Sequence, residues 1–272
     1  MSEIYMHSWT FRERSFAEAC QAAAAIGYDG IEIFPGHFPE QDDPAGSIAM
    51  LAAEAESAGT TIAAVPLRAD SRSAAEFDRA AGTAEKVLDA GAEAGVKFVN
   101  CMISQIPGPS WSESGSAAIS GHQHSWTQHY VKFLAESSRG RSPAICLETH
   151  MVFAHDSAAA AAGYVKGLGG RLGITLDPAN LAGYGHGESW EQAIALASQE
   201  ILYLHAKNHH GRGQGADYDR GLADGDIDWS GVIRSLRDRA SLPPICIEYS
   251  GSAEPWGTAA RDFEFLQSLI AR

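Results

Sequence analysis

The sequence predicts a single α/β domain, a (β/α)8 TIM barrel that spans residues 1–272. Eight short runs of β-branched or aliphatic residues alternate with alanine-rich helical patterns along the whole chain, which is typical of βαβ units and a parallel sheet. Eight such units in a chain of 272 residues have the size expected of this barrel. Within several runs polar and aliphatic residues alternate, so one face would meet the helices and the other the barrel interior.

The expected elements follow one another in strict alternation. We expect strands at residues 4–9, 30–34, 61–67, 98–103, 145–149, 173–177, 202–207 and 245–249. We expect helices at residues 15–26, 46–58, 74–94, 126–137, 156–167, 188–199, 229–239 and 257–271. An open doubly wound sheet is the alternative, but the first strand leads into Met6-His-Ser-Trp-Thr-Phe11 without the glycine-rich phosphate turn that such sheets use.

Candidate metal ligands stand at the carboxyl ends of four consecutive expected strands: Glu148, Asp177, His205 and Glu248. At such positions in a barrel of parallel strands, side chains point into the same mouth. Three carboxylates and one imidazole form an oxygen-rich ligand set suited to a divalent cation. The pattern predicts one divalent metal ion, with Mn2+ favoured and Mg2+, Co2+ or Zn2+ as alternatives.

A structural role is the alternative for each of these residues. Asp177 precedes Pro178 and could cap a helix, whereas Glu148 and Glu248 stand in apolar stretches where an uncompensated charge is costly. Three converging carboxylates would also raise one another's pKa unless a cation lies between them. As a group, the residues favour a metal site over a structural polar cluster.

The composition narrows the possible partners. The formal net charge is −14, which repels phosphate backbones and anionic lipid, so we expect neither nucleic acid nor a membrane as a partner. The chain opens without a secretory leader, and its four cysteines have no metal-type spacing, so we expect reduced thiols and a cytoplasmic protein.

One connection is unusually long. Residues 104–125 are rich in serine, glycine and proline and show no periodicity. Because the segment follows the fourth strand, we expect a lid over the barrel mouth, with a floppy insertion as the alternative. Its histidines, His122 and His124, are expected to be solvated rather than metal ligands.

Several short stretches together resemble a known family. They are Gly30-Ile-Glu-Ile, Leu147-Glu-Thr-His150, Leu176-Asp-Pro-Ala-Asn180, Leu204-His-Ala-Lys-Asn208, Gly225-Asp-Ile-Asp-Trp229 and Ile247-Glu-Tyr249. The chain resembles the xylose isomerase-like TIM barrels, which include sugar isomerases and epimerases, inosose and dehydroshikimate dehydratases, and an endonuclease branch. The resemblance implies one divalent metal held by Glu148, Asp177, His205 and Glu248, with Glu148 and Glu248 as the acid–base pair.

Other polar residues near the expected mouth are candidates for substrate binding: His7, Glu32, His150, Asn180, Lys207 and Arg212. Lys207 would point inward two residues beyond His205 and could hold a substrate oxygen, whereas for His150 a structural role is an equal alternative. Epimerases that this chain resembles carry Asp-x-x-His after the sixth strand, whereas this chain has Asp177-x-x-Asn180. That difference argues against a plain ketose 3-epimerase.

These features predict an isomerase or epimerase of a sugar or cyclitol that transfers a proton through a metal-stabilised enediolate. The alternative is a lyase of the same barrel, which would dehydrate a dehydroshikimate- or inosose-type substrate or eliminate a substituent from a 3-keto glycoside. A non-catalytic sugar-binding barrel is a third hypothesis. The expected partner is a small sugar or keto-sugar, and the resemblance allows a homodimer or homotetramer.

Overall fold

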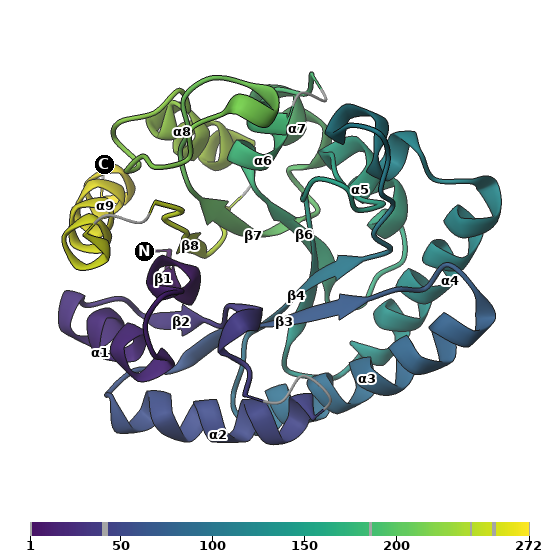
Figure 1. Cartoon of the computed structure of the whole chain (residues 1–272), viewed down its shortest axis with the longest axis horizontal. Coiled ribbons are helices and arrows are strands. Elements are labelled where there is room, and N and C mark those ends of the chain that lie inside the picture. Colours follow the sequence, from purple (N-terminus) through teal and green to yellow (C-terminus); the bar gives the residue numbers. More distant parts are fainter. Residues whose placement is uncertain (1, 40–42, 185–186, 240, 252–253, 272) are drawn as a thin grey trace.

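The strands form a closed barrel. The computed structural model describes residues 2–39, 43–184, 187–239, 241–251 and 254–271. Within them, parallel strands pair in chain order from β1 to β8, and β8 closes the ring by pairing with β1. The helices lie around the strands as an outer ring (Figure 1). The predicted (β/α)8 barrel is confirmed. No helix in the described part of the chain combines the length and apolar character needed to cross a membrane.

The strands are β1 Ile4–His7, β2 Gly30–Glu32, β3 Ile62–Ala69, β4 Phe98–Ile103, β5 Ala144–Glu148, β6 Leu172–Leu176, β7 Ile201–Ala206 and β8 Ile245–Ile247. The α-helices are α1 Phe16–Ile26, α2 Pro44–Ser57, α3 Ala74–Glu93, α4 Gly121–Ser137, α5 Ala158–Val165, α6 Pro178–Tyr184, α7 Trp190–Ala197, α8 Trp229–Arg239 and α9 Pro255–Ile270. Short 3-10 turns are η1 Ser8–Phe11, η2 Pro35–His37, η3 Trp111–Glu113, η4 Gly115–Ala117 and η5 Gly213–Gly215.

Serine side chains fix the start of many of the helices. Each of these serines accepts a hydrogen bond from a backbone N–H in the first helical turn, which satisfies a donor that the helix itself leaves unpaired. The capping serines are Ser15, Ser73, Ser120, Ser157 and Ser189. The capping determines where each helix leaves the loop at the barrel rim.

Two apolar regions support the barrel. The larger region lies between the strands and the helices and takes the aliphatic face of each strand, such as Ile145 and Leu147 of β5. The second fills the lower interior of the barrel, where the Phe98 and Tyr203 rings stack with centroids 4.5 Å apart and Tyr5 lies beside Tyr203. These aromatic side chains close the barrel below its mouth.

The structure corrects two expectations about local elements. The fourth helix begins at Gly121 rather than at residue 126, because Ser120 and Gln123 form a capping box. The last part of the expected loop 104–125 is therefore helical, and it includes His122 and His124. An additional short helix, α6, follows Asp177, whose side chain accepts hydrogen bonds from the first backbone N–H groups of that helix.

The remaining residues of the long connection contact the loop between β5 and α5. The Ile106 N–H donates to the Val152 carbonyl, and the Ser116 N–H donates to the Asp156 carboxylate. Two 3-10 turns, η3 and η4, also lie in this segment. Closure of the segment over the mouth stays a prediction.

Candidate metal centre

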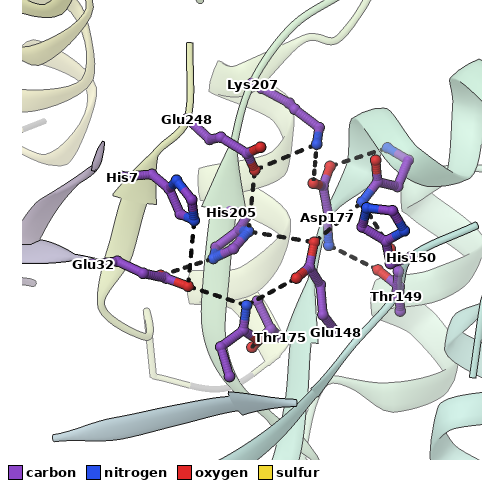
Figure 2. Close-up of polar contacts among 12 residues, drawn as sticks. His7, Glu32, Glu148, Thr149, His150, Thr175, Asp177, His205, Lys207 and Glu248 are labelled. Atoms are coloured by element: carbon purple, nitrogen blue, oxygen red, sulfur yellow. Dashed lines mark hydrogen bonds and ion pairs between the residues drawn. The ribbon is translucent and has the colours of Figure 1, made fainter. Parts of the chain in front are cut away.

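The structure brings together the four ligands expected from the sequence. Glu148 ends β5, Asp177 follows β6, His205 lies near the end of β7, and Glu248 follows β8. One potential ligand atom from each of them lies within 4.8 Å of all the others (Figure 2). Asp177, His205 and Glu148 are almost fully buried, and Glu248 is largely so. Four strand ends thus present one compact set of oxygen and nitrogen donors.

His205 is oriented by a carboxylate behind it. Its Nε2 lies 2.9 Å from Oε2 of Glu32, and an ionised carboxylate can only accept, so Nε2 carries the proton. The other ring nitrogen, Nδ1, is buried without a hydrogen-bond partner, 3.3 Å from Glu248 and 3.6 Å from Glu148. A carboxylate that fixes the far nitrogen of a ligating histidine is the usual arrangement behind a metal. The unpaired Nδ1 beside two carboxylates therefore fits a divalent cation.

The two carboxylate oxygens of Asp177 make different contacts. Oδ1 accepts hydrogen bonds from the N–H groups of Ala179 and Asn180 at 2.9 and 3.0 Å. Oδ2 lies 2.9 Å from Nζ of Lys207, which is also 3.4 Å from Oε2 of Glu248. The helix start thus holds the carboxylate in place and leaves Oδ2 turned towards positive charge.

Two amide side chains hold Glu148 and Glu32. Nδ2 of Asn100 donates to Oε1 of Glu32 at 3.1 Å and to Oε2 of Glu148 at 2.8 Å. Oδ1 of Asn100 accepts from the Thr175 hydroxyl, which fixes the orientation of the amide. Nδ2 of Asn180 lies 3.3 Å from Oε1 of Glu148. Asn100 was not among the residues expected from the sequence, although it is a polar side chain within an apolar strand.

The electrostatics of the centre favour bound positive charge. Burial acts to raise the pKa of the Glu148 carboxyl, but the facing His205 imidazole holds this pKa well below its usual range. The Lys207 ammonium likewise lowers the pKa of Glu248 against the effect of burial. For Asp177 burial prevails and raises the pKa, although Lys207 opposes the shift.

The pKa of His205 responds to the same carboxylates. Burial acts to lower it, but Glu32 and Glu148 outweigh that effect and raise it well above the ordinary value. A protonated His205 would thus supply part of the positive charge that these carboxylates demand. A divalent cation would replace the proton on Nδ1, because a histidine ligates metals in its neutral form.

A cavity of about 160 Å³ opens above this centre. Its wall contains Glu148, His205 and Glu248 on one side and Trp9, Phe34, Pro35, Pro66, Arg68 and Met102 on the other. Three of the expected substrate-binding residues, His7, Glu32 and His150, also line it. Engineered protein cavities of about 150 Å³ bind benzene, so a space of this size suits a molecule with one six-membered ring.

The other expected substrate-binding residues lie elsewhere. Lys207 and Asn180 are buried among the ligands rather than on the cavity wall. Arg212 is exposed on the loop between β7 and α8 and does not line the cavity. Glu32 reaches the cavity, but both its oxygens accept hydrogen bonds from protein groups, namely Asn100, Tyr203 and His205.

The indole of Trp9 is held firmly in the cavity wall. The Phe34 ring meets it edge-on, with centroids 4.6 Å apart and planes at 77°. The Arg12 guanidinium lies over the indole at 4.7 Å and donates to the Gly251 carbonyl. The Trp9 N–H of the backbone donates to Nδ1 of His7. These contacts make Trp9 and Phe34 a preformed aromatic platform opposite the metal ligands.

Comparisons with known proteins agree with this geometry. The model of the family described as xylose isomerase-like TIM barrel matches residues 20–269. No curated protein sequence gives a significant match.

Solved structures resemble the whole chain in fold at low sequence identity. D-allulose 3-epimerase from Methylomonas sp. is 16% identical, with a TM-score of 0.75 over 98% of this chain and 96% of that one. The probable 3-DHS dehydratase AsbF from Bacillus anthracis is 17% identical, with a TM-score of 0.67 over 99% of both chains. A xylose isomerase-like TIM barrel protein from Mycobacterium smegmatis, in complex with magnesium, is 16% identical, with a TM-score of 0.75 over 99% of this chain and 97% of that one.

Proposed function

Since the chain belongs to the xylose isomerase-like TIM barrel family, we propose that it is a divalent-metal-dependent enzyme that isomerises or epimerises a sugar or cyclitol. One observation carries the proposal: the ligand atoms of Glu148, Asp177, His205 and Glu248 lie together at the mouth, beside a cavity of the size of one sugar ring. The buried Nδ1 of His205, which has no hydrogen-bond partner, supports the metal part of the proposal.

The side chains divide the chemistry between them. A divalent cation bound by these four residues supplies a Lewis acid that polarises a substrate carbonyl. Glu148 and Glu248 remain ionised because nearby cations lower their pKa, so either can remove the proton from the carbon next to that carbonyl. In an isomerase the carboxyl group that took the proton returns it to the adjacent carbon. In an epimerase the other carboxylate first takes up a proton from solvent and delivers it to the opposite face of the same carbon, while the first carboxyl group releases its proton to solvent. The Lys207 ammonium holds the carboxylates of Asp177 and Glu248 in position, and its contact with a substrate oxygen stays a prediction.

The surrounding residues keep this machinery in position. Glu32 fixes the tautomer and direction of His205, and Asn100 joins Glu32 to Glu148. Trp9 and Phe34 line one wall of the cavity as an apolar surface. His7 and His150 lie at the cavity wall as hydrogen-bonding groups for substrate hydroxyls. Asn180 and Arg212 stay predictions as substrate contacts.

A lyase is the second candidate. The same removal of a proton leads to elimination when the neighbouring carbon carries a leaving group. Two observations favour this alternative: the likeness of the whole chain in fold to a probable dehydratase, and Asn180 at the position where the resembled epimerases carry histidine. Both candidates use the same metal centre, so they differ only in the fate of the substrate carbanion.

Exchange of hydrogen in heavy water separates the candidates. The Mn2+-loaded protein would be incubated in D2O with ketoses, inososes, dehydroshikimate and 3-keto glycosides, and the products analysed by NMR and mass spectrometry. Deuterium incorporation with unchanged atomic composition supports an isomerase or epimerase, whereas loss of water or of an aglycone supports a lyase. Glu148→Gln should abolish the reaction, and Glu136→Gln, an exposed carboxylate on α4, should not. A chain that binds no divalent metal would contradict the proposal.

Mn2+ is the metal we propose, with Mg2+, Co2+ and Zn2+ as alternatives that metal titration would rank. Cytoplasmic location and association into a homodimer or homotetramer stay predictions. The buried free cysteines, Cys20, Cys101, Cys146 and Cys246, support a reducing compartment.

A further inference from the structure

Arg68 is a cationic side chain at the cavity wall. It lies near the carboxyl end of β3, where Val65 and Leu67 face the outer core and Pro66 and Arg68 face the cavity. Arg68 is exposed, and no hydrogen bond or ion pair joins it to another residue in the described part of the chain. Its guanidinium therefore has all its donors available to a ligand.

Other cationic groups around the mouth are already engaged. Lys207 lies between the carboxylates of Asp177 and Glu248. Arg12 covers the outer side of the Trp9 indole and donates to backbone carbonyls. Among the described residues that line the cavity, Arg68 is the arginine or lysine left with an uncommitted charge.

The charge balance of the metal centre bears on the role of the Arg68 guanidinium. With a divalent cation bound, that cation and the Lys207 ammonium balance the three ligand carboxylates. The carboxylate of Glu32 leaves one negative charge at the centre, and it accepts hydrogen bonds from Asn100, Tyr203 and His205. Arg68 then adds positive charge to the opposite wall of the same cavity. A neutral sugar needs only hydrogen bonds at this wall, whereas an anionic group would also use the charge of Arg68. An anionic substrate would be repelled by a protein of net charge −14 unless a local cation attracted it.

We propose that Arg68 binds an anionic group of the substrate, a carboxylate or a phosphate, while the metal ligands hold its reacting end. This inference rests on the proposed function, because it presumes that a polyhydroxylated substrate is bound at the metal centre. A guanidinium binds either anion through two parallel hydrogen bonds, which fix the orientation of the substrate as well as its affinity. The Trp9–Phe34 platform and Pro66 provide the apolar surface for the ring carbons between the two ends.

Matched pairs of probes test the proposal on the metal-loaded protein. The pairs are D-fructose with D-fructose 6-phosphate, and D-xylose with D-glucuronate, so each pair adds one anionic group to the same sugar skeleton. Titration calorimetry would be run on the wild type, Arg68→Gln, Arg68→Lys and the control Arg79→Gln, which removes an exposed arginine from α3. The first pair tests phosphate recognition, and the second tests carboxylate recognition.

In the wild type and in Arg79→Gln, we expect the anionic member of one pair to bind about tenfold or more tightly than its neutral partner, as a charge-assisted hydrogen-bonded pair implies. Arg68→Gln should remove this preference and leave the neutral member within twofold, while Arg68→Lys should keep part of it. The preference should also weaken with rising salt.

The proposal is overturned if neither anionic probe binds more tightly than its neutral partner, or if Arg68→Gln weakens both members equally. A Mn2+ titration done first distinguishes failure of the proposed function from failure of the proposed role of Arg68. A protein that takes up no metal removes the proposed function, whereas a metal-loaded protein with no preference for charge removes only the role of Arg68.

Discussion

The two halves of the barrel mouth differ in chemistry although the strands that build them are equivalent. Strands β5 to β8 supply Glu148, Asp177, His205 and Glu248, and most of their polar atoms are fixed by one another or by neighbouring amides. Strands β1 to β4 and their loops supply Glu32 and Asn100, which support that network from below. They also supply the Trp9–Phe34 platform, prolines, Met102 and Arg68, which has no hydrogen bond or ion pair among the described residues. The metal ligands suit a fixed reaction centre, and the platform with Arg68 suits recognition of a particular substrate.

The contrast explains how one family can host several reactions. The metal ligands are joined in a buried network, so replacing one of them disturbs the others. The Trp9–Phe34 platform is held by packing and aromatic contacts, and no hydrogen bond or ion pair joins Arg68 to another described residue. Substitutions there can change which molecule fits without dismantling the reaction centre. The predictions below test this division.

Replacing a ligand carboxylate should have the largest effect. Glu148→Gln or Glu248→Gln removes both a metal ligand and a proton-transferring group, so we expect turnover to fall about 10²- to 10⁴-fold. Steady-state kinetics on the substrate identified by deuterium exchange would measure this. Turnover within tenfold of the wild type for both variants would remove these residues from the acid–base pair.

Replacing Lys207 should destabilise the metal-free protein more than the metal-loaded protein. Lys207→Met leaves the buried Asp177 and Glu248 carboxylates without a cation, so without metal we expect the free energy of unfolding to fall by about 3–5 kcal/mol. Saturating Mn2+ should restore most of the loss, because the cation replaces the missing charge. Urea unfolding with and without metal would show this, with Lys207→Arg as the conservative control. An equal loss under both conditions would contradict the explanation.

Glu32 should affect metal affinity through His205. Glu32→Gln weakens the acceptor that orients the imidazole, so we expect Mn2+ affinity to fall about 10- to 100-fold. Calorimetric titration of Mn2+ against this variant and Glu136→Gln would measure the difference. Unchanged affinity would show that the ring is held by packing alone.

A substitution in the Trp9–Phe34 platform should have the smallest effect, and this effect should be confined to substrate binding. Trp9→Ala removes an aromatic surface worth about 1 kcal/mol, so we expect KM to rise about fivefold, with kcat and Mn2+ affinity nearly unchanged. If Trp9→Ala lowered Mn2+ affinity as much as Glu32→Gln, the platform would not be separable from the metal centre.

The sequence predicted the barrel and the convergence of four side chains because both depend on local pattern. Alternation of strands and helices determines the fold class, and a residue at the end of an inward-facing series must point into the mouth. Glu148 and His205 could be placed in this way without coordinates. The capping box at Ser120 was also visible in the sequence, yet the helix it begins was expected five residues later.

Other parts of the site depend on contacts that closing the barrel creates. Asn100 bridges Glu32 and Glu148, which lie 68 and 48 residues away in the chain, so no local pattern reveals its role. Arg212 was expected near the substrate but lies on an exposed loop, because loop direction is not set by strand periodicity. Whether a cation is engaged, as Lys207 is, or available, as Arg68 is, depends on neighbours from other strands.

The stacked rings of Phe98 and Tyr203 have one further consequence. They fill the barrel interior below the cavity, so within the described part of the chain the cavity opens at the carboxyl ends of the strands. The product must leave through the opening by which the next substrate enters, so the two molecules compete for the same cavity. The product should therefore be a competitive inhibitor, and any segment that covers this opening would limit the rate of turnover.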